Sequence, residues 1–145
     1  MLRTTLTVAL AAAIAALTVV LPAAGQPVSS TTRTLRLDSR FTYSHTTGRL
    51  EVATDKLSIA HRVVGHDVVD CAEVTKATFE CSFTEFIAGH GTLQAEGFQG
   101  DTNAPVTLAV VGGTGAYASA SGTMTTSDEN TSIEHYELRY TLPNK

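Results

Sequence analysis

The chain has 145 residues, and its 10 Lys and Arg stand against 14 Asp and Glu, which gives a formal net charge of −4 at pH 7. Proteins that bind nucleic acid or anionic membrane surfaces need a basic face, so this balance argues against both as partners. The length fits one domain with one modest core.

Residues 1–25 have the pattern of a secretory signal peptide. Arg3 supplies a positive start, an uncharged run from Leu6 to Leu21 follows, and the small residues Ala23 and Gly25 fit cleavage after Gly25. The alternative is a membrane anchor, but the apolar run has about 16 residues where a spanning helix needs about 20. We therefore expect a secreted, extracellular protein that has no membrane contact after cleavage, with a single domain over residues 26–145.

Apolar and polar residues alternate along most of this domain, and almost no stretch has the period of a helix. Such alternation, with one apolar face, predicts half-buried antiparallel strands. We expect strands over residues 34–43, 56–63, 78–87, 92–96, 106–110 and 135–142, another strand near 64–71, and a Ser-, Thr- and Gly-rich strand over 116–125. About eight strands separated by turn residues make an all-β fold, either a small barrel or a sandwich. A closed barrel of eight strands has room inside for side chains or one small ligand.

Cys71 and Cys81 are the only cysteines of the sequence. They lie on either side of Val74–Ala77, which is typical of a turn, and two cysteines in a secreted chain usually pair. We expect a disulfide across this hairpin. A redox or metal-binding pair is the alternative, and the absence of CxxC spacing argues against it.

The stretch VVGGTGAY, Val110–Tyr117, has the look of a nucleotide-binding loop. Such a loop needs a helix after it and further βαβ units, and neither is found in the sequence. We therefore interpret Gly112, Gly113 and Gly115 as a tight turn that needs positive φ and close backbone approach.

Together with GTLQAEG at Gly91–Gly97, the stretch VVGGTGAYASASG up to Gly122 resembles the dirigent and allene oxide cyclase barrel superfamily. The strand Val64–Cys71 also fits the secreted bacterial members, and the likeness covers roughly residues 33–142. The resemblance implies an eight-stranded antiparallel β-barrel, often a homodimer or homotrimer, with an apolar lumen open at one end. It implies cyclisation or steered coupling of a reactive small molecule without a cofactor.

Two positions depart from the dirigent pattern. The resemblance places an Asp and an Arg of dirigent proteins at positions that are Ala116 and Ser121 here. Both are implicated in handling a quinone methide, so their absence argues against plant-type dirigent chemistry. Cyclisation in a shaped apolar pocket that contains a carboxylate stays open.

A few side chains are candidates for a site. Glu85 lies on the apolar face of the strand Phe79–Ile87, where desolvation would raise its pKa and suit it to acid–base catalysis; the alternative is a solvated position at a barrel mouth. Four residues that share apolar faces are candidates for ligand binding, although core packing is an alternative for each of them: Tyr43, His61, Tyr136 and Tyr140. The scattered histidines have no ligand spacing, so we expect no metal site.

The sequence leaves three functions open, and it does not establish whether the protein is an enzyme. The first is a cofactor-independent isomerase or cyclase that binds an apolar small molecule in the lumen. The second is a carrier of such a molecule without chemistry. The third is a structural or cell-surface interaction barrel, because a fold alone does not fix function.

Overall fold

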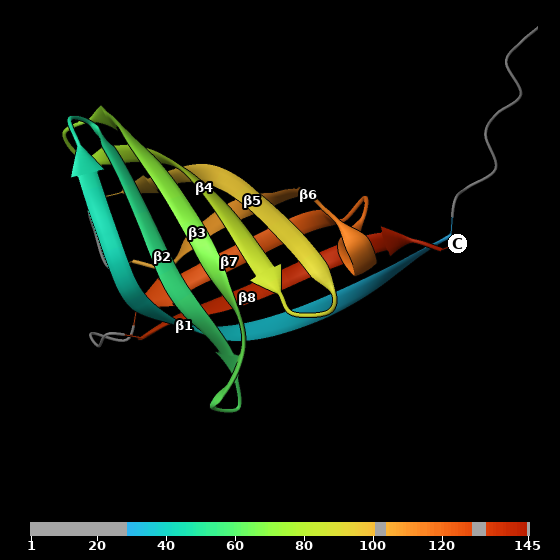
Figure 1. Cartoon of the computed structure of the whole chain (residues 1–145). Helices are drawn as coiled ribbons and strands as arrows, with labels where there is room; N and C mark the ends of the chain where they lie inside the picture. Colours follow the sequence, from blue (N-terminus) through green and yellow to red (C-terminus); the bar gives the residue numbers. More distant parts are fainter. Residues whose placement is uncertain (1–28, 101–103, 129–132, 145) are drawn as a thin grey trace, which may run out of the picture.

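The computed structural model describes residues 29–100, 104–128 and 133–144, and within them the chain forms eight strands and one short 3₁₀ helix. In chain order these elements are β1 (Ser30–Thr47), β2 (Leu50–Ile59), β3 (Arg62–Thr75), β4 (Thr78–Ile87), β5 (Gly91–Gly100), β6 (Val106–Gly113), η1 (Gly115–Tyr117), β7 (Ser121–Asp128) and β8 (Ile133–Pro143). The strands form one closed antiparallel barrel, which β8 completes by pairing with β1 (Figure 1). The expected eight-stranded β-barrel is confirmed.

The expected signal peptide over residues 1–25 lies outside the described residues. No helix in the part of the chain that the structure describes is long and apolar enough to cross a membrane.

The alternation of the sequence decides which side chains fill the barrel. The inward positions carry the apolar residues, and the outward positions carry mostly Thr, Ser and charged residues. The buried core includes Leu37, Leu57, Phe83, Leu93, Leu108, Met124 and Leu138. At roughly 25 cal/mol per Å² of apolar surface removed from water, this interior is the main stabilising contribution to the fold.

The expected disulfide is confirmed. Cys71 on β3 and Cys81 on β4 are register partners and are bonded to each other. The turn between these strands is Lys76–Ala77, within the segment that the sequence indicated.

The GGTG segment closes one end of the barrel. β6 ends at Gly113, and η1 then carries Tyr117 into the core, where its ring meets that of Tyr140 edge-on at a centroid distance of 5.7 Å. The backbone N–H of Ala116 donates to the carbonyl of His90, which ties η1 to the turn before β5. Gly115 has φ +60°, as expected for the turn. The expectation of positive φ is wrong for Gly112 and Gly113, because they are the last two residues of β6 and keep extended backbone there. Figure 1 shows η1 at the opposite end of the barrel from the β1–β2 turn.

Two of the expected strands include residues that the structure places in turns. The strand expected over 116–125 is wrong for its first residues, because the chain folds over the barrel end and β7 begins only at Ser121. The strand expected over 56–63 is wrong beyond Ile59, because Ala60 and His61 form the β2–β3 turn with φ of 48° and 65°. Positive φ at both central residues is typical of two-residue hairpin turns, but it usually comes with Asn or Gly, so the sequence carried no signal here.

We predict that Gly113→Ala will destabilise the protein, whereas Gly112→Ala will not. A Cβ at Gly113 would collide with the backbone carbonyl of Thr92, which accepts the backbone N–H of Thr114 and cannot move without breaking that hydrogen bond. A Cβ at Gly112 would meet only the side-chain oxygen of Gln94 at 3.7 Å, an ordinary contact. Urea unfolding followed by far-ultraviolet circular dichroism should show a loss of about 1–3 kcal/mol for Gly113→Ala. Equal stability of the two variants would contradict this account of the turn.

Candidate functional site

Three carboxylic acids lie side by side inside the barrel. Asp55 on β2 is the register partner of Asp67 on β3, and Asp67 is the register partner of Glu85 on β4. Partners across neighbouring strands have Cβ atoms about 5 Å apart, so the three acids form a row across the lumen wall. The exposed fraction is 8% for Asp55 and 0% for Asp67 and Glu85. We call Asp55, Asp67 and Glu85 the acid row.

A β-bulge in β1 shapes the outer end of the acid row. The register of β1 against β2 shifts between Phe41 and Tyr43. The Ser39 hydroxyl donates to Asp55 Oδ2 at 3.0 Å. Burial raises the pKa of Asp55, while hydrogen bonds from Ser39 and from the backbone of Thr42, the extra residue of the bulge, oppose the rise. The bulge therefore supplies a donor that a regular strand would not place there.

Asp67 lies in the middle of the row. Its Oδ1 accepts the backbone N–H of Asp55 at 3.0 Å, whereas its Oδ2 has no partner. Burial raises the pKa of Asp67 to about 6, and the neighbouring Asp55 adds to the rise. The Tyr136 hydroxyl, which donates to Glu134 at 3.2 Å, also interacts with Asp67 and opposes that rise.

Glu85 is at the β4 end of the acid row, and its carboxyl has fewer hydrogen-bond partners than those of Asp55 and Asp67. Neither of its carboxyl oxygens has a hydrogen-bond partner. Burial raises the pKa of Glu85 to about 8; its own backbone amide opposes the rise, and Asp67 adds to it. Glu85 is therefore mostly protonated at pH 7, whereas Asp67 is mostly ionised. Two adjacent carboxyls with separated pKa values are the usual arrangement of an acid and a base.

The sequence candidates fall into two groups. Glu85 and Tyr136 are both in the interior, and the alternative of a solvated Glu85 at a barrel mouth is wrong. Tyr140 is also buried, but it lies four residues along β8 from Tyr136, which is about 13 Å, and packs on Tyr117 at the closed end. Tyr43 is 59% exposed, because the bulge turns it outward to pair with Thr54.

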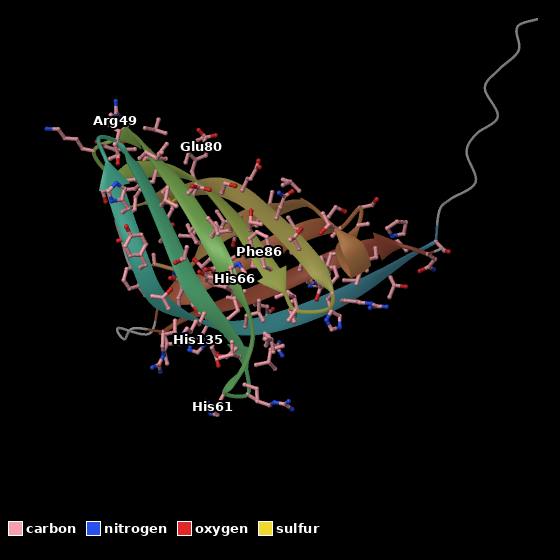
Figure 2. All side chains as sticks on the ribbon, viewed as in Figure 1. Arg49, His61, His66, Glu80, Phe86 and His135 are labelled. Atoms are coloured by element: carbon pink, nitrogen blue, oxygen red, sulfur yellow. A yellow bond between two sulfur atoms is a disulfide. The ribbon has the colours of Figure 1, made fainter. Side chains whose placement is uncertain are left out.

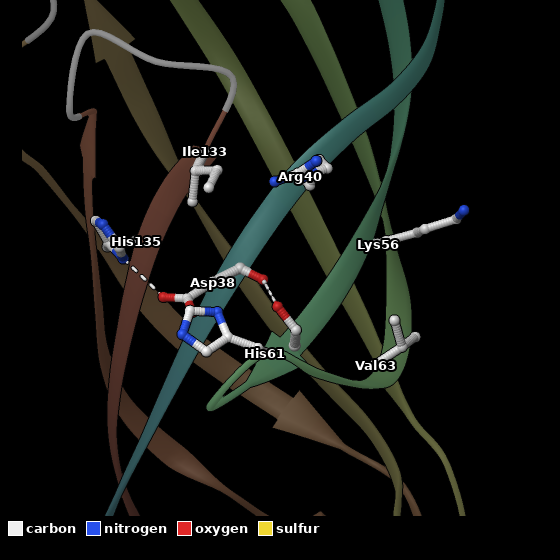
Figure 3. A pocket seen from close by; sticks show the side chains of 8 residues that line it. Asp38, Arg40, Lys56, His61, Val63, Ile133 and His135 are labelled. Carbon is white, nitrogen blue, oxygen red and sulfur yellow. Dashed lines mark hydrogen bonds and ion pairs between the residues drawn. The ribbon is translucent and has the colours of Figure 1, made fainter.

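His61 lies outside the lumen. Because it is in the β2–β3 turn and not on a strand, it does not share the apolar face of Leu57, and that expectation is wrong. It lines a pocket of about 600 Å³ on the outer wall between β1, β2 and β8 (Figure 3). In this pocket His135 Nδ1 lies 2.8 Å from Asp38 Oδ1, and the exposed Arg40 and Lys56 are register partners. The acid of the outer pocket is thus already paired, in contrast to the acid row.

Sequence reasoning missed Asp55 and Asp67. Both occupy inward positions of a period-two pattern, Asp55 two residues before Leu57 and Asp67 two residues before Val69. The signal was therefore the one that identified Glu85, an acid where the alternation calls for an apolar residue. Asp55 lies just before the strand expected over 56–63, and the strand near 64–71 is expected from its motif and not from its alternation.

No protein-family model matches the sequence, and no curated protein sequence is significantly similar to it. Among solved structures, a pyocyanin demethylase is 30% identical, with a TM-score of 0.66 over 74% of this chain and 99% of that one. A pterocarpan synthase dirigent protein is 12% identical, with a TM-score of 0.67 over 88% of this chain and 100% of that one. The chain therefore belongs to the superfamily of dirigent and allene oxide cyclase-like barrels.

We predict that Glu85→Gln flattens the dependence of stability on pH. The folded state keeps the Glu85 proton up to about pH 8, whereas the unfolded chain loses it near 4.5. Stability from this group is therefore full below pH 4.5 and falls as the pH rises to about 8. Between pH 6 and 8 the decline should be about 1.4 kcal/mol per pH unit, and Glu85→Gln should remove most of it.

The measurement is urea unfolding at pH 5, 6, 7 and 8. The matched control is Glu80→Gln, on the same strand but outward and exposed, as Figure 2 shows. Glu80→Gln should leave the slope unchanged. Parallel profiles for wild type and Glu85→Gln would mean that Glu85 is not protonated in the folded state.

Proposed function

We propose that this protein is a secreted, cofactor-independent enzyme that binds an apolar small molecule in the barrel lumen and steers its isomerisation or cyclisation. The observation that carries the proposal is the buried Glu85, whose two carboxyl oxygens lack partners beside the equally buried Asp67. A domain of this size has a net stability of only about 5–15 kcal/mol. Keeping an unsatisfied carboxyl in its core is costly, and such conflicts concentrate at functional sites.

The two acids suit a proton-transfer isomerisation. Glu85 donates its proton to one atom of the substrate, while Asp67 accepts a proton from another atom. The substrate gains and loses one proton, so its composition does not change and no oxidant or reductant is needed. The proton then returns from Asp67 to Glu85, its neighbour across β3 and β4, and the pair is reset.

Tyr136 would act as an orienting donor in this scheme. Burial raises the pKa of Tyr136 well above its usual value, and Asp67 and Glu134 add to the rise, so the hydroxyl keeps its proton. It therefore stays a hydrogen-bond donor throughout the reaction.

Access would come from the end of the barrel away from η1. Asp55 is the most exposed member of the acid row, and its register partner Phe41 is 55% exposed. Towards that end the inward side chains are only half-buried: Ala53, Val69, Phe79, Gln99 and Val106. The acids themselves are closed off from solvent, so a substrate would enter by displacing side chains on this side.

The names of the structural neighbours support an enzyme over a carrier. A demethylase and a synthase both convert small molecules, and both share this barrel. The disulfide between Cys71 and Cys81 is consistent with an extracellular location, which the N-terminal sequence also favours.

The test is an untargeted conversion assay. Wild-type protein, Glu85→Gln and Glu80→Gln are each incubated with an apolar metabolite extract of the source culture, which is then analysed by liquid chromatography and mass spectrometry. We expect wild type and Glu80→Gln to convert a compound into a product of the same mass and different retention time. Glu85→Gln should lower the rate at least 100-fold, within the usual range for a lost acid–base group.

Two results would contradict the proposal. If a compound co-purifies with the protein and is never converted, the protein is a carrier. If no compound binds or changes, the barrel is a structural or interaction module.

A further inference from the structure

The charged groups buried in the barrel are all of one sign. The buried polar and charged residues among those described are Ser39, Asp55, Asp67, Glu85 and Thr126. No Lys, Arg or His in the described ranges is buried with them. Four carboxyl oxygens of the acid row have no hydrogen-bond donor: Asp55 Oδ1, Asp67 Oδ2, Glu85 Oε1 and Glu85 Oε2. Almost all buried acceptors in folded proteins have a donor, so this group lacks something that donates.

One proton shared between Glu85 and Asp67 provides a donor for only some of these four oxygens. When Glu85 is protonated, its hydroxyl can donate to Asp67 Oδ2 across the β3–β4 register. The other Glu85 oxygen and Asp55 Oδ1 still have no donor. The oxygens that remain call for a ligand that can donate hydrogen bonds to them.

The acid row does not have the form of a closed metal site. In the described part of the chain, no three His, Cys, Asp or Glu side chains converge closely enough to hold a metal ion. The acid row instead steps across three strands, and at about 4.8 Å per strand its ends are separated by about 10 Å. A ligand that contacts the row must therefore be extended, as an organic molecule is.

Aromatic side chains flank the row. Phe83, on the same strand as Glu85, meets Tyr136 edge-on with ring centroids 5.9 Å apart, and Tyr136 interacts with Asp67. Phe41 lies beside Asp55 at the more exposed end. Aromatic rings attract organic cations through their faces and pack against flat apolar bodies through their edges.

We propose that the lumen selects a small molecule that carries an alkylammonium group on an aromatic ring system, with the ammonium group on the acid row and the ring among Phe83, Tyr136 and Phe41. This inference rests on the proposed function, since it assigns a substrate class to the same lumen. It also gives the acid row a partner of opposite charge, which the chain itself does not supply.

The experiment compares three probes that share one ring system. They are 1-naphthylmethylammonium, neutral 1-naphthylmethanol and anionic 1-naphthoate, each titrated calorimetrically into the intact disulfide-bonded protein at pH 7.5. We expect the ammonium to bind at least tenfold more tightly than the alcohol, and the carboxylate to bind most weakly. Asp67→Asn should reduce ammonium binding at least tenfold and leave alcohol binding within about twofold, because Asp67 is the carboxylate that is ionised near neutral pH. Glu80→Gln should change neither.

Circular dichroism of each variant first establishes that the barrel is folded. Equal binding of the ammonium and the alcohol, both at one site per chain, would overturn the cation inference and leave lumen binding intact. Ammonium binding that survives in Asp67→Asn would overturn it too, because the cation would then be held by the acidic outer surface. Failure of all three probes would overturn it, while the conversion assay would still decide on the proposed function.

Discussion

Closure of the sheet is the constraint on which the rest of this structure depends. Because β8 pairs with β1, every strand has two neighbours and no edge is left free. A shift of one residue in any strand would turn all its side chains to the other face and break the pairing on both sides. The barrel therefore holds Asp55, Asp67 and Glu85 inward at one level, even though each acid alone would be more stable in water.

The response of the acids to this burial explains the chemistry of the site. With no buried base beside them in the described residues, the acids can lower their charge only by holding protons. Burial is the largest cause of both shifts, and it raises the pKa of Glu85 to about 8 and that of Asp67 to about 6, so Glu85 is the acid of the pair and Asp67 the better base. Hydrogen bonding opposes the rise at both carboxyls. Tyr136 and the backbone of Asp55 act on Asp67, whereas the backbone amide of Glu85 acts on its own carboxyl.

Most of the fold could be predicted from the sequence, because alternation and disulfide spacing are local signals. The barrel, the Cys71–Cys81 bond and the GGTG turn all follow from residues that are close in the chain. The errors came from places where one residue changes the register without any sequence signal. The bulge after Phe41 turned Tyr43 outward, and the turn at Ala60 and His61 has no Gly or Asn. Glu85 could be identified alone, but the acid row could not, since its register depends on three strands pairing correctly.

Membership of the superfamily does not decide where the chemistry lies on this barrel. The resemblance placed the dirigent acid and cation at Ala116 and Ser121, and the structure places both of these residues exposed at the closed end, Ala116 in η1 and Ser121 at the start of β7. The acids of this chain instead lie on β2, β3 and β4, beyond the side chains that fill the closed end. The same fold can therefore carry its buried charged groups on different strands, and in the described part of this chain those buried groups are all acids. Among the described residues the interior holds no buried Lys, Arg or His, whereas an intermediate that develops positive charge would find three carboxyls at fixed positions.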